Sequence, residues 1–238
     1  MTMEKTYSPI PRLKHLEEGY PPIIACISDA HDLTKETLAR IDTTKKEGIY
    51  IDYYVRNSKE YKKGTGYTMS HCDEKMKYSE FYLFCSGITV VGTDKITGKN
   101  ISFLTHQDPY TVKSLTFKNE LDKAMQEMID RCVSGSIDAV IFSSRARSIK
   151  DTRSYEESMK HLSELCENKL HFKPTILTGP NIVSKQSSDK FTDAYFDTEN
   201  RRFDLVRSDQ ISDRLNEPFT VDEYEKQAEL WKEDSKVD

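Results

Sequence analysis

The sequence is poor in the features that define several special classes of protein. Its 238 residues include only 9 glycines and 8 prolines, which excludes a collagen-like or a Pro/Gly-rich low-complexity chain. Five cysteines are too sparse for a small disulfide-stabilised domain, and their number is odd. No apolar run approaches the roughly 18–20 residues that a membrane-spanning helix needs. What remains is a globular chain that is long enough to bury a sizeable core.

The charge balance does not indicate a polyanion-binding protein. The 35 lysines and arginines against 40 acidic residues give a formal net charge of −5, and mild acidity does not draw a chain to nucleic acid or to anionic lipid. We therefore expect no nucleic acid and no membrane among its partners. The first 20 residues lack the apolar core of a secretory signal, and an odd number of cysteines suits a reducing compartment. The expected location is the cytoplasm.

The pattern along the chain divides it into three parts. Residues 1–20 read as a polar, flexible N-terminal arm, residues 21–215 as a single α+β domain, and residues 216–238 as an acidic C-terminal helix that starts at a capping box, Thr220 with Glu223. Within the domain, strands and helices mix without strict alternation, which favours the α+β class. The expected helices and strands, and one long loop, are strand 23–27, helix 34–41, strand 49–55, loop 56–77, helix 121–132, strand 137–142, a helix from residue 154 onward, strand 174–178, and a hairpin over 191–207.

A β-hairpin over residues 78–106 is the clearest local pattern. Residues 78–94 are rich in aromatic and β-branched residues, with an interruption at Ser86-Gly87, and residues 100–106 form the returning strand. The segment DKITGK between them is a turn. If Asp94 pairs with Lys99, then His106 faces Gly87, and Cys85 is a diagonal neighbour of His106 on the same face of the sheet.

A cysteine and a histidine at this spacing suggest nucleophilic chemistry. A cysteine hydrolase needs its thiol within hydrogen-bond reach of an imidazole. Diagonal neighbours lie ~7–8 Å apart in a flat sheet, so a bulge at Ser86-Gly87 would have to close the gap. The alternative is a packed strand cysteine and a histidine that ends a strand. Cys26, Cys132 and Cys166 are expected in the core, and His71-Cys72 lacks a zinc-ligand spacing, so no metal site is predicted.

The segment FCSGITVVGTDKITGKNISFLTH resembles that of the chemoreceptor glutamine deamidases (CheD) and of the cytotoxic necrotizing factor catalytic domain. The resemblance covers roughly residues 78–210 and implies mixed β-sheets packed face to face with outer helices, an α/β/β/α deamidase-like fold. It implies a cysteine-dependent amidohydrolase that acts on a protein substrate without a cofactor. Cys85 would be the nucleophile and His106 the general base, and backbone N–H groups near Ser86 and Gly87 would bind the oxyanion.

The same comparison places the family's nucleophile at Gly87, where this chain has no thiol. The family reads Gly-Ser-Cys where this chain reads Cys85-Ser86-Gly87. Two interpretations therefore stay open. In one, a local shift lets Cys85 act as the nucleophile. In the other, the scaffold is catalytically silent and acts as a protein-binding or regulatory module.

A basic loop provides a second candidate site. Arg145, Arg147 and Arg153 lie between the end of a strand and the start of a helix, a place where anions bind. Arginine suits phosphate or carboxylate because it can bind both oxygens at once. The alternative is a solvated loop without a ligand.

Overall fold

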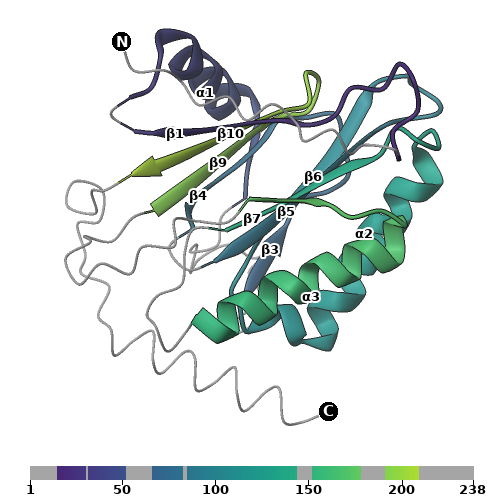
Figure 1. Cartoon of the computed structure of the whole chain (residues 1–238). Coiled ribbons are helices and arrows are strands. Elements are labelled where there is room, and N and C mark those ends of the chain that lie inside the picture. Colours follow the sequence, from purple (N-terminus) through teal and green to yellow (C-terminus); the bar gives the residue numbers. More distant parts are fainter. Residues whose placement is uncertain are drawn as a thin grey trace.

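The fold is α+β and consists of two mixed β-sheets that face each other (Figure 1). The computed structural model describes residues 15–30, 32–51, 66–82, 85–143, 152–177 and 191–208. Each sheet has five strands. The predicted class, with mixed sheets packed face to face and helices outside, is confirmed.

The strands of the first sheet, sheet A, come from both ends of the described chain. In spatial order they are β1 (Ile24–Asp29), β10 (Arg202–Ser208), β9 (Phe191–Asp197), β4 (Lys77–Tyr82) and β2 (Ile49–Tyr50). The second sheet, sheet B, is built mainly from the middle of the chain. Its spatial order is β3 (Tyr67–Met69), β6 (Asn100–Gln107), β5 (Ser86–Thr93), β7 (Asp138–Ser143) and β8 (Thr175–Leu177).

The helices cover the outer faces of the two sheets, which gives four layers (Figure 1). Helix α1 (Lys35–Glu47) packs on sheet A, where Ile41 meets Tyr195 and Val206. Helices α2 (Leu115–Arg131) and α3 (Thr152–Leu170) pack on sheet B, and a short 3-10 helix, η1 (Thr111–Lys113), precedes α2. No described helix is long and apolar enough to cross a membrane.

Local signals explain where the helices begin. The side chain of Thr34 accepts the Thr37 N–H at the start of α1, and Ser114 accepts the Phe117 N–H at the start of α2, as N-cap residues do. Helix α1 is longer than the predicted helix 34–41. It continues to Glu47 because nothing breaks it before Gly48, and its last turns still bury a side chain, that of Thr44.

The structure corrects the prediction for residues 78–94. This segment forms two strands, β4 and β5, which belong to different sheets. The interruption lies ahead of Ser86, so β5 itself begins at that residue. The predicted loop 56–77 also contains the short strand β3, which pairs with β6. The second hairpin, β9–β10, is confirmed.

The end of the predicted N-terminal arm lies against the domain. The ring of His15 stacks on Phe172 at 3.8 Å between centroids, and its Nε2 lies 3.3 Å from the Asp138 carboxylate. The Glu17 N–H donates to the Gly135 carbonyl. Residues 1–14 and the predicted acidic helix 216–238 lie outside the described residues.

Candidate functional site

The pairing of β5 with β6 is the register predicted from the sequence. Ser86 pairs with Gln107 and Thr93 with Asn100, and the Asp94 N–H donates to the Lys99 carbonyl. In this register the side chain of His106 lies on the face of sheet B that points toward sheet A. Leu104 and Cys85 belong to the hydrophobic cluster between the two sheets, so Cys85 and His106 share this inner face.

The β5–β6 ladder is irregular at Gly87. The residues of β5 that pair with β6 are Ser86 and then Thr89, so the pairing skips Gly87 and Ile88. The Ile88 N–H donates instead to the side chain of Thr105 at 3.0 Å. A Cβ atom added to Gly87 would overlap the ring of Phe142 and lie 2.7 Å from the Thr105 carbonyl oxygen. The space that a side chain at position 87 would need is therefore filled by Phe142.

His106 connects the two sheets through a hydrogen bond to β4. Its Nδ1 lies 2.9 Å from the Ser79 hydroxyl oxygen, and that hydroxyl donates to the Ile51 carbonyl at 2.6 Å. Because the hydroxyl proton of Ser79 is donated to Ile51, His106 must donate its Nδ1 proton to the Ser79 oxygen. The neutral ring then carries its acceptor lone pair on Nε2.

Burial keeps this imidazole neutral. His106 is 0% exposed, and its ring stacks on Tyr82 at 3.7 Å between centroids. Burial lowers the pKa of His106 well below the ordinary value of 6.5. The phenol of Tyr82 is equally buried and donates to the Thr105 carbonyl. The site therefore has an uncharged histidine held between an aromatic ring and a serine.

Cys85 lies beside the same tyrosine. Its side chain is 3% exposed and belongs to the inter-sheet cluster with Tyr82 and Phe142. The structure thus brings Cys85 and His106 into one buried layer around Tyr82. In this arrangement neither side chain is open to a substrate from solvent.

The predicted oxyanion-binding positions are also engaged inside the protein. Ser86 is 1% exposed, and its hydroxyl accepts from the Gln107 side-chain amide at 3.2 Å. The backbone N–H of Ile88, next to Gly87, is bound to Thr105. This part of the site is therefore the buried start of strand pairing in β5, and the polar groups named here form hydrogen bonds within the protein.

Ser79 and Tyr82 are the site residues that the sequence analysis missed. Both lie on β4, which belongs to the opposite sheet. The segment 78–94 gave a single strand signal, so no side chain of β4 was expected to face His106. The aromatic residues around Ser79 were the available signal for a strand, but they do not indicate to which of the two sheets that strand belongs.

The remaining cysteines are structural. Burial raises the pKa values of Cys72, Cys132 and Cys166 to about 12, which makes unreactive thiols. Cys26 is also buried, and its sulfur accepts from Arg202 at 3.1 Å. Among the described residues, no three His, Cys, Asp or Glu side chains could hold a metal ion together.

The predicted anion-binding loop is not described by the structure. Arg145 and Arg147 lie outside the described residues, and so does the side chain of Arg153, whose backbone is in the first turn of α3. The anion site stays a prediction.

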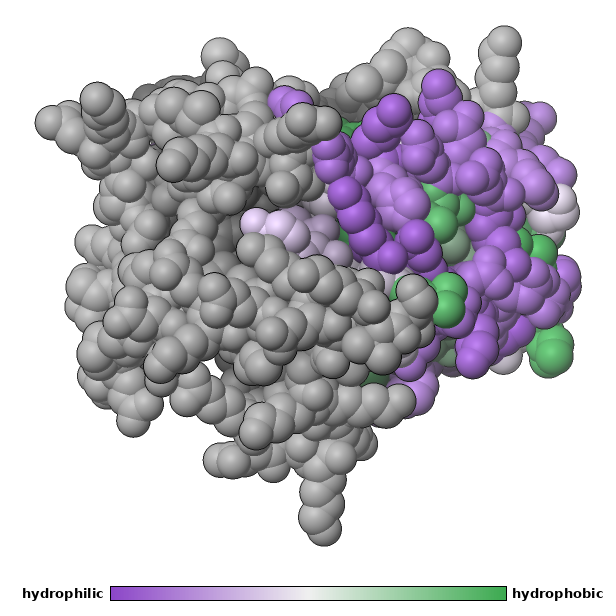
Figure 2. Space-filling view, turned by 90° about the horizontal axis from the view of Figure 1, so that it is seen from below, coloured by the Kyte–Doolittle hydropathy of each residue, from purple (hydrophilic) through white to green (hydrophobic). Residues whose placement is uncertain are grey.

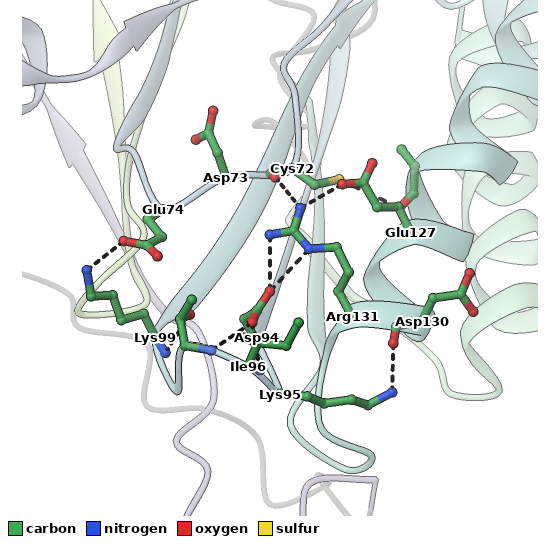
Figure 3. A network of polar contacts seen from close by, with 12 residues as sticks. Cys72, Asp73, Glu74, Asp94, Lys95, Ile96, Lys99, Glu127, Asp130 and Arg131 are labelled. Atoms are coloured by element: carbon green, nitrogen blue, oxygen red, sulfur yellow. Dashed lines mark hydrogen bonds and ion pairs between the residues drawn. The ribbon is translucent and has the colours of Figure 1, made fainter.

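A second polar network stabilises the tip of the β5–β6 hairpin (Figure 3). Asp94 accepts the N–H groups of Ile96 and Thr97, and Arg131 donates to the same carboxylate from Nε and Nη2 at 3.1 Å. Arg131 also donates to the Cys72 carbonyl. The network ties the hairpin to the end of α2 and to the segment before β4.

The Asp94 network leads to a pH prediction. The N–H groups of Thr97 and Ile96, followed by Arg131, lower the pKa of Asp94 below 3.8. A carboxyl with a lowered folded-state pKa stabilises the fold above its unfolded-state pKa, and this contribution is lost as the pH falls through the folded-state value. We expect Asp94→Asn to lower the thermal midpoint at about pH 7. At about pH 3 the difference from wild type should narrow. Equal differences at both pH values would contradict this assignment.

The described part of one face offers no extended apolar surface. Viewed from below Figure 1, the side on which α2 and α3 lie, the described residues are mainly hydrophilic with small separate hydrophobic spots (Figure 2). Single exposed apolar side chains of this kind are normal.

Comparison with protein-family models gives no match for this chain. A search among curated proteins gives no match either.

Proposed function

We propose that the chain is a deamidase-like scaffold that performs no chemistry at the Cys85–His106 position and acts as a protein-binding or regulatory module. The observation that carries this proposal is the ring of Phe142, which takes the space that a side chain at position 87 would need. A nucleophile cannot occupy that position without repacking the layer between the sheets.

The burial of both candidate residues supports the same proposal. Cys85 is 3% exposed and His106 is 0% exposed. An amide substrate has to reach the sulfur and the imidazole together, and here Tyr82 stacks over the ring. The histidine instead serves as a hydrogen-bonded contact between β4 and β6.

A cysteine amidohydrolase is the second candidate, and the Ser79–His106 hydrogen bond favours it. That bond leaves Nε2 as the basic nitrogen of a neutral ring, which is the form that a general base requires. Cys85 would then be the nucleophile after a movement that opens the layer.

Ammonia release from a glutamine-containing protein substrate such as casein distinguishes the two candidates. We expect no release above a protein-free blank, and no difference between wild type and Cys85→Ala. Ammonia release that disappears in Cys85→Ala but persists in the matched variant Cys166→Ala would establish the hydrolase instead. Iodoacetamide labelling offers a second readout. We expect native Cys85 to react no faster than Cys166, whose thiol is fully buried.

A further inference from the structure

The start of the described chain contacts the domain in the way that a bound peptide contacts a receptor. The ring of His15 stacks on Phe172 at 3.8 Å between centroids and 3° between planes, and its Nε2 lies 3.3 Å from the Asp138 carboxylate. Two residues later, the Glu17 N–H donates to the Gly135 carbonyl at 2.9 Å. One side chain and one backbone group are therefore recognised together.

The two domain groups that hold His15 are also fixed by other contacts. Phe172 packs against the hydrophobic core of sheet B. The Asp138 side chain is 3% exposed, and its carboxylate accepts the Ile23 N–H at 2.8 Å and the Ala139 N–H at 2.9 Å. The ring and the carboxylate thus form a largely preformed site for a flat side chain that carries an N–H donor, and small-ligand and peptide sites are commonly preformed.

Gly135 makes room for the second contact. It has a φ of 75°, and a Cβ atom added to it would lie 2.3 Å from the Cγ atom of Glu17. The side chain of Glu17 therefore crosses directly over this glycine, where any larger residue would collide with it. The Gly135 carbonyl is close enough to bind the backbone of the incoming chain for the same reason.

Residues 15–18, which we call the docked segment, can separate from the domain without unfolding a core. Their side chains are exposed or half-buried. After Gly19, which has a φ of 99°, the chain is anchored again, because the Pro21 carbonyl accepts from Arg201 at 2.9 Å and Ile23 is 5% exposed. Gly19 is a suitable hinge, since hinges are a few loop residues that absorb a backbone rotation.

We propose that Phe172, Asp138 and Gly135 form a peptide-binding site, which the docked segment occupies in the free chain and which a partner protein binds by displacing it. The partner segment carries a flat ring with an N–H donor, histidine or tryptophan, and a free backbone N–H two residues later. This inference rests on the proposed function, because it names where the protein-binding module binds.

The docked segment makes the site autoinhibited. A segment on a short tether has an effective concentration on the order of millimolar at its own site. A partner at lower concentration therefore binds only if it makes further contacts or if the hold on the docked segment is weakened.

Titration of the ¹⁵N-labelled full chain with a synthetic peptide of residues 11–20, followed by NMR, tests the proposal. His15→Ala in the chain weakens the docked segment and leaves the site open more often. The dissociation constant of the peptide should be at least about tenfold lower for this variant than for wild type, because apparent affinity scales with the fraction of chains whose site is open. The matched control, His71→Ala, removes an exposed histidine from another segment and should keep the wild-type value.

Two changes then test recognition of the ring in the His15→Ala chain. Phe172→Leu keeps an apolar side chain but cannot stack, and it should weaken peptide binding about tenfold. A peptide in which alanine replaces its single histidine should lose binding to a similar degree, and this measurement does not depend on the folding of the Phe172 variant.

Three results would overturn the proposal: no saturable shift in the His15→Ala chain, equal dissociation constants for this variant and wild type, or equal binding of the two peptides. Any of them would leave the proposed non-catalytic function standing. Ammonia release that depends on Cys85 would refute that function without changing the peptide titration, so the two failures can be distinguished.

Discussion

Replacing Gly87 with alanine should destabilise the protein by about 3 kcal/mol, at the upper end of the range for added volume in a packed core. The new methyl group would overlap the ring of Phe142 and lie 2.7 Å from the Thr105 carbonyl oxygen. The ring cannot move aside easily because it packs edge-on against both Tyr82 and Phe203. Urea unfolding of the two proteins, followed by circular dichroism, measures the difference.

A double-mutant cycle with Phe142 separates this clash from a general loss of strand propensity. Phe142→Leu removes the far end of the ring, and in the wild-type background it should cost about 1–2 kcal/mol. In the Gly87→Ala background the same change should cost less, because it also relieves the overlap. We expect a coupling of at least about 1 kcal/mol. Additive effects would show that Phe142 is not what excludes a side chain at position 87.

The same geometry bears on the choice between the two functions. A cysteine at position 87 would meet the same obstacle as alanine, with a larger side chain. The layer at position 87 is filled by the ring of Phe142, which leaves no room for a side chain there. This packing supports the proposed non-catalytic function, and the stability measurements above test it without a substrate.

The hairpin register could be predicted because it depends on local signals. The turn at Asp94 uses a carboxylate that accepts the N–H groups two and three residues further on, those of Ile96 and Thr97, and Gly98 adopts a positive φ of 69°. With the turn in place, period-two alternation determines which face His106 occupies. Cys85 could be assigned to the same face by the same reasoning.

The partners of His106 could not be predicted, because they depend on contacts between distant strands. Ser79 and Tyr82 are only a few residues before β5, yet their strand belongs to the opposite sheet. Nothing in the apolar pattern of residues 78–94 distinguishes one long strand from two strands that change sheets. Strand β3 was missed for a related reason, since three residues are too few for an alternation signal.

Arg201 is the second position where a large effect is expected, and its role was invisible in the sequence. It lies in the turn between β9 and β10 with a φ of 51°, and it is 1% exposed. Its guanidinium donates to the side chains of Asn100 and Thr93 and to the carbonyls of Pro21 and Ser136. These acceptors belong to the β5–β6 hairpin, the N-terminal segment and the loop before β7.

Arg201→Ala should lower the free energy of unfolding by about 4 kcal/mol, because it leaves buried acceptors without a donor and opens a cavity between three segments. Arg201→Lys should recover little of this loss, since one ammonium group cannot reach all the acceptors that the planar guanidinium group binds on its different sides. The adjacent Arg202→Ala is the matched control. Its side chain is 25% exposed, so we expect a loss of about 1 kcal/mol. If Arg201→Ala were no more destabilising than Arg202→Ala, the turn would not join these segments, and the close approach of the two hairpins would have to rest on the apolar layer alone.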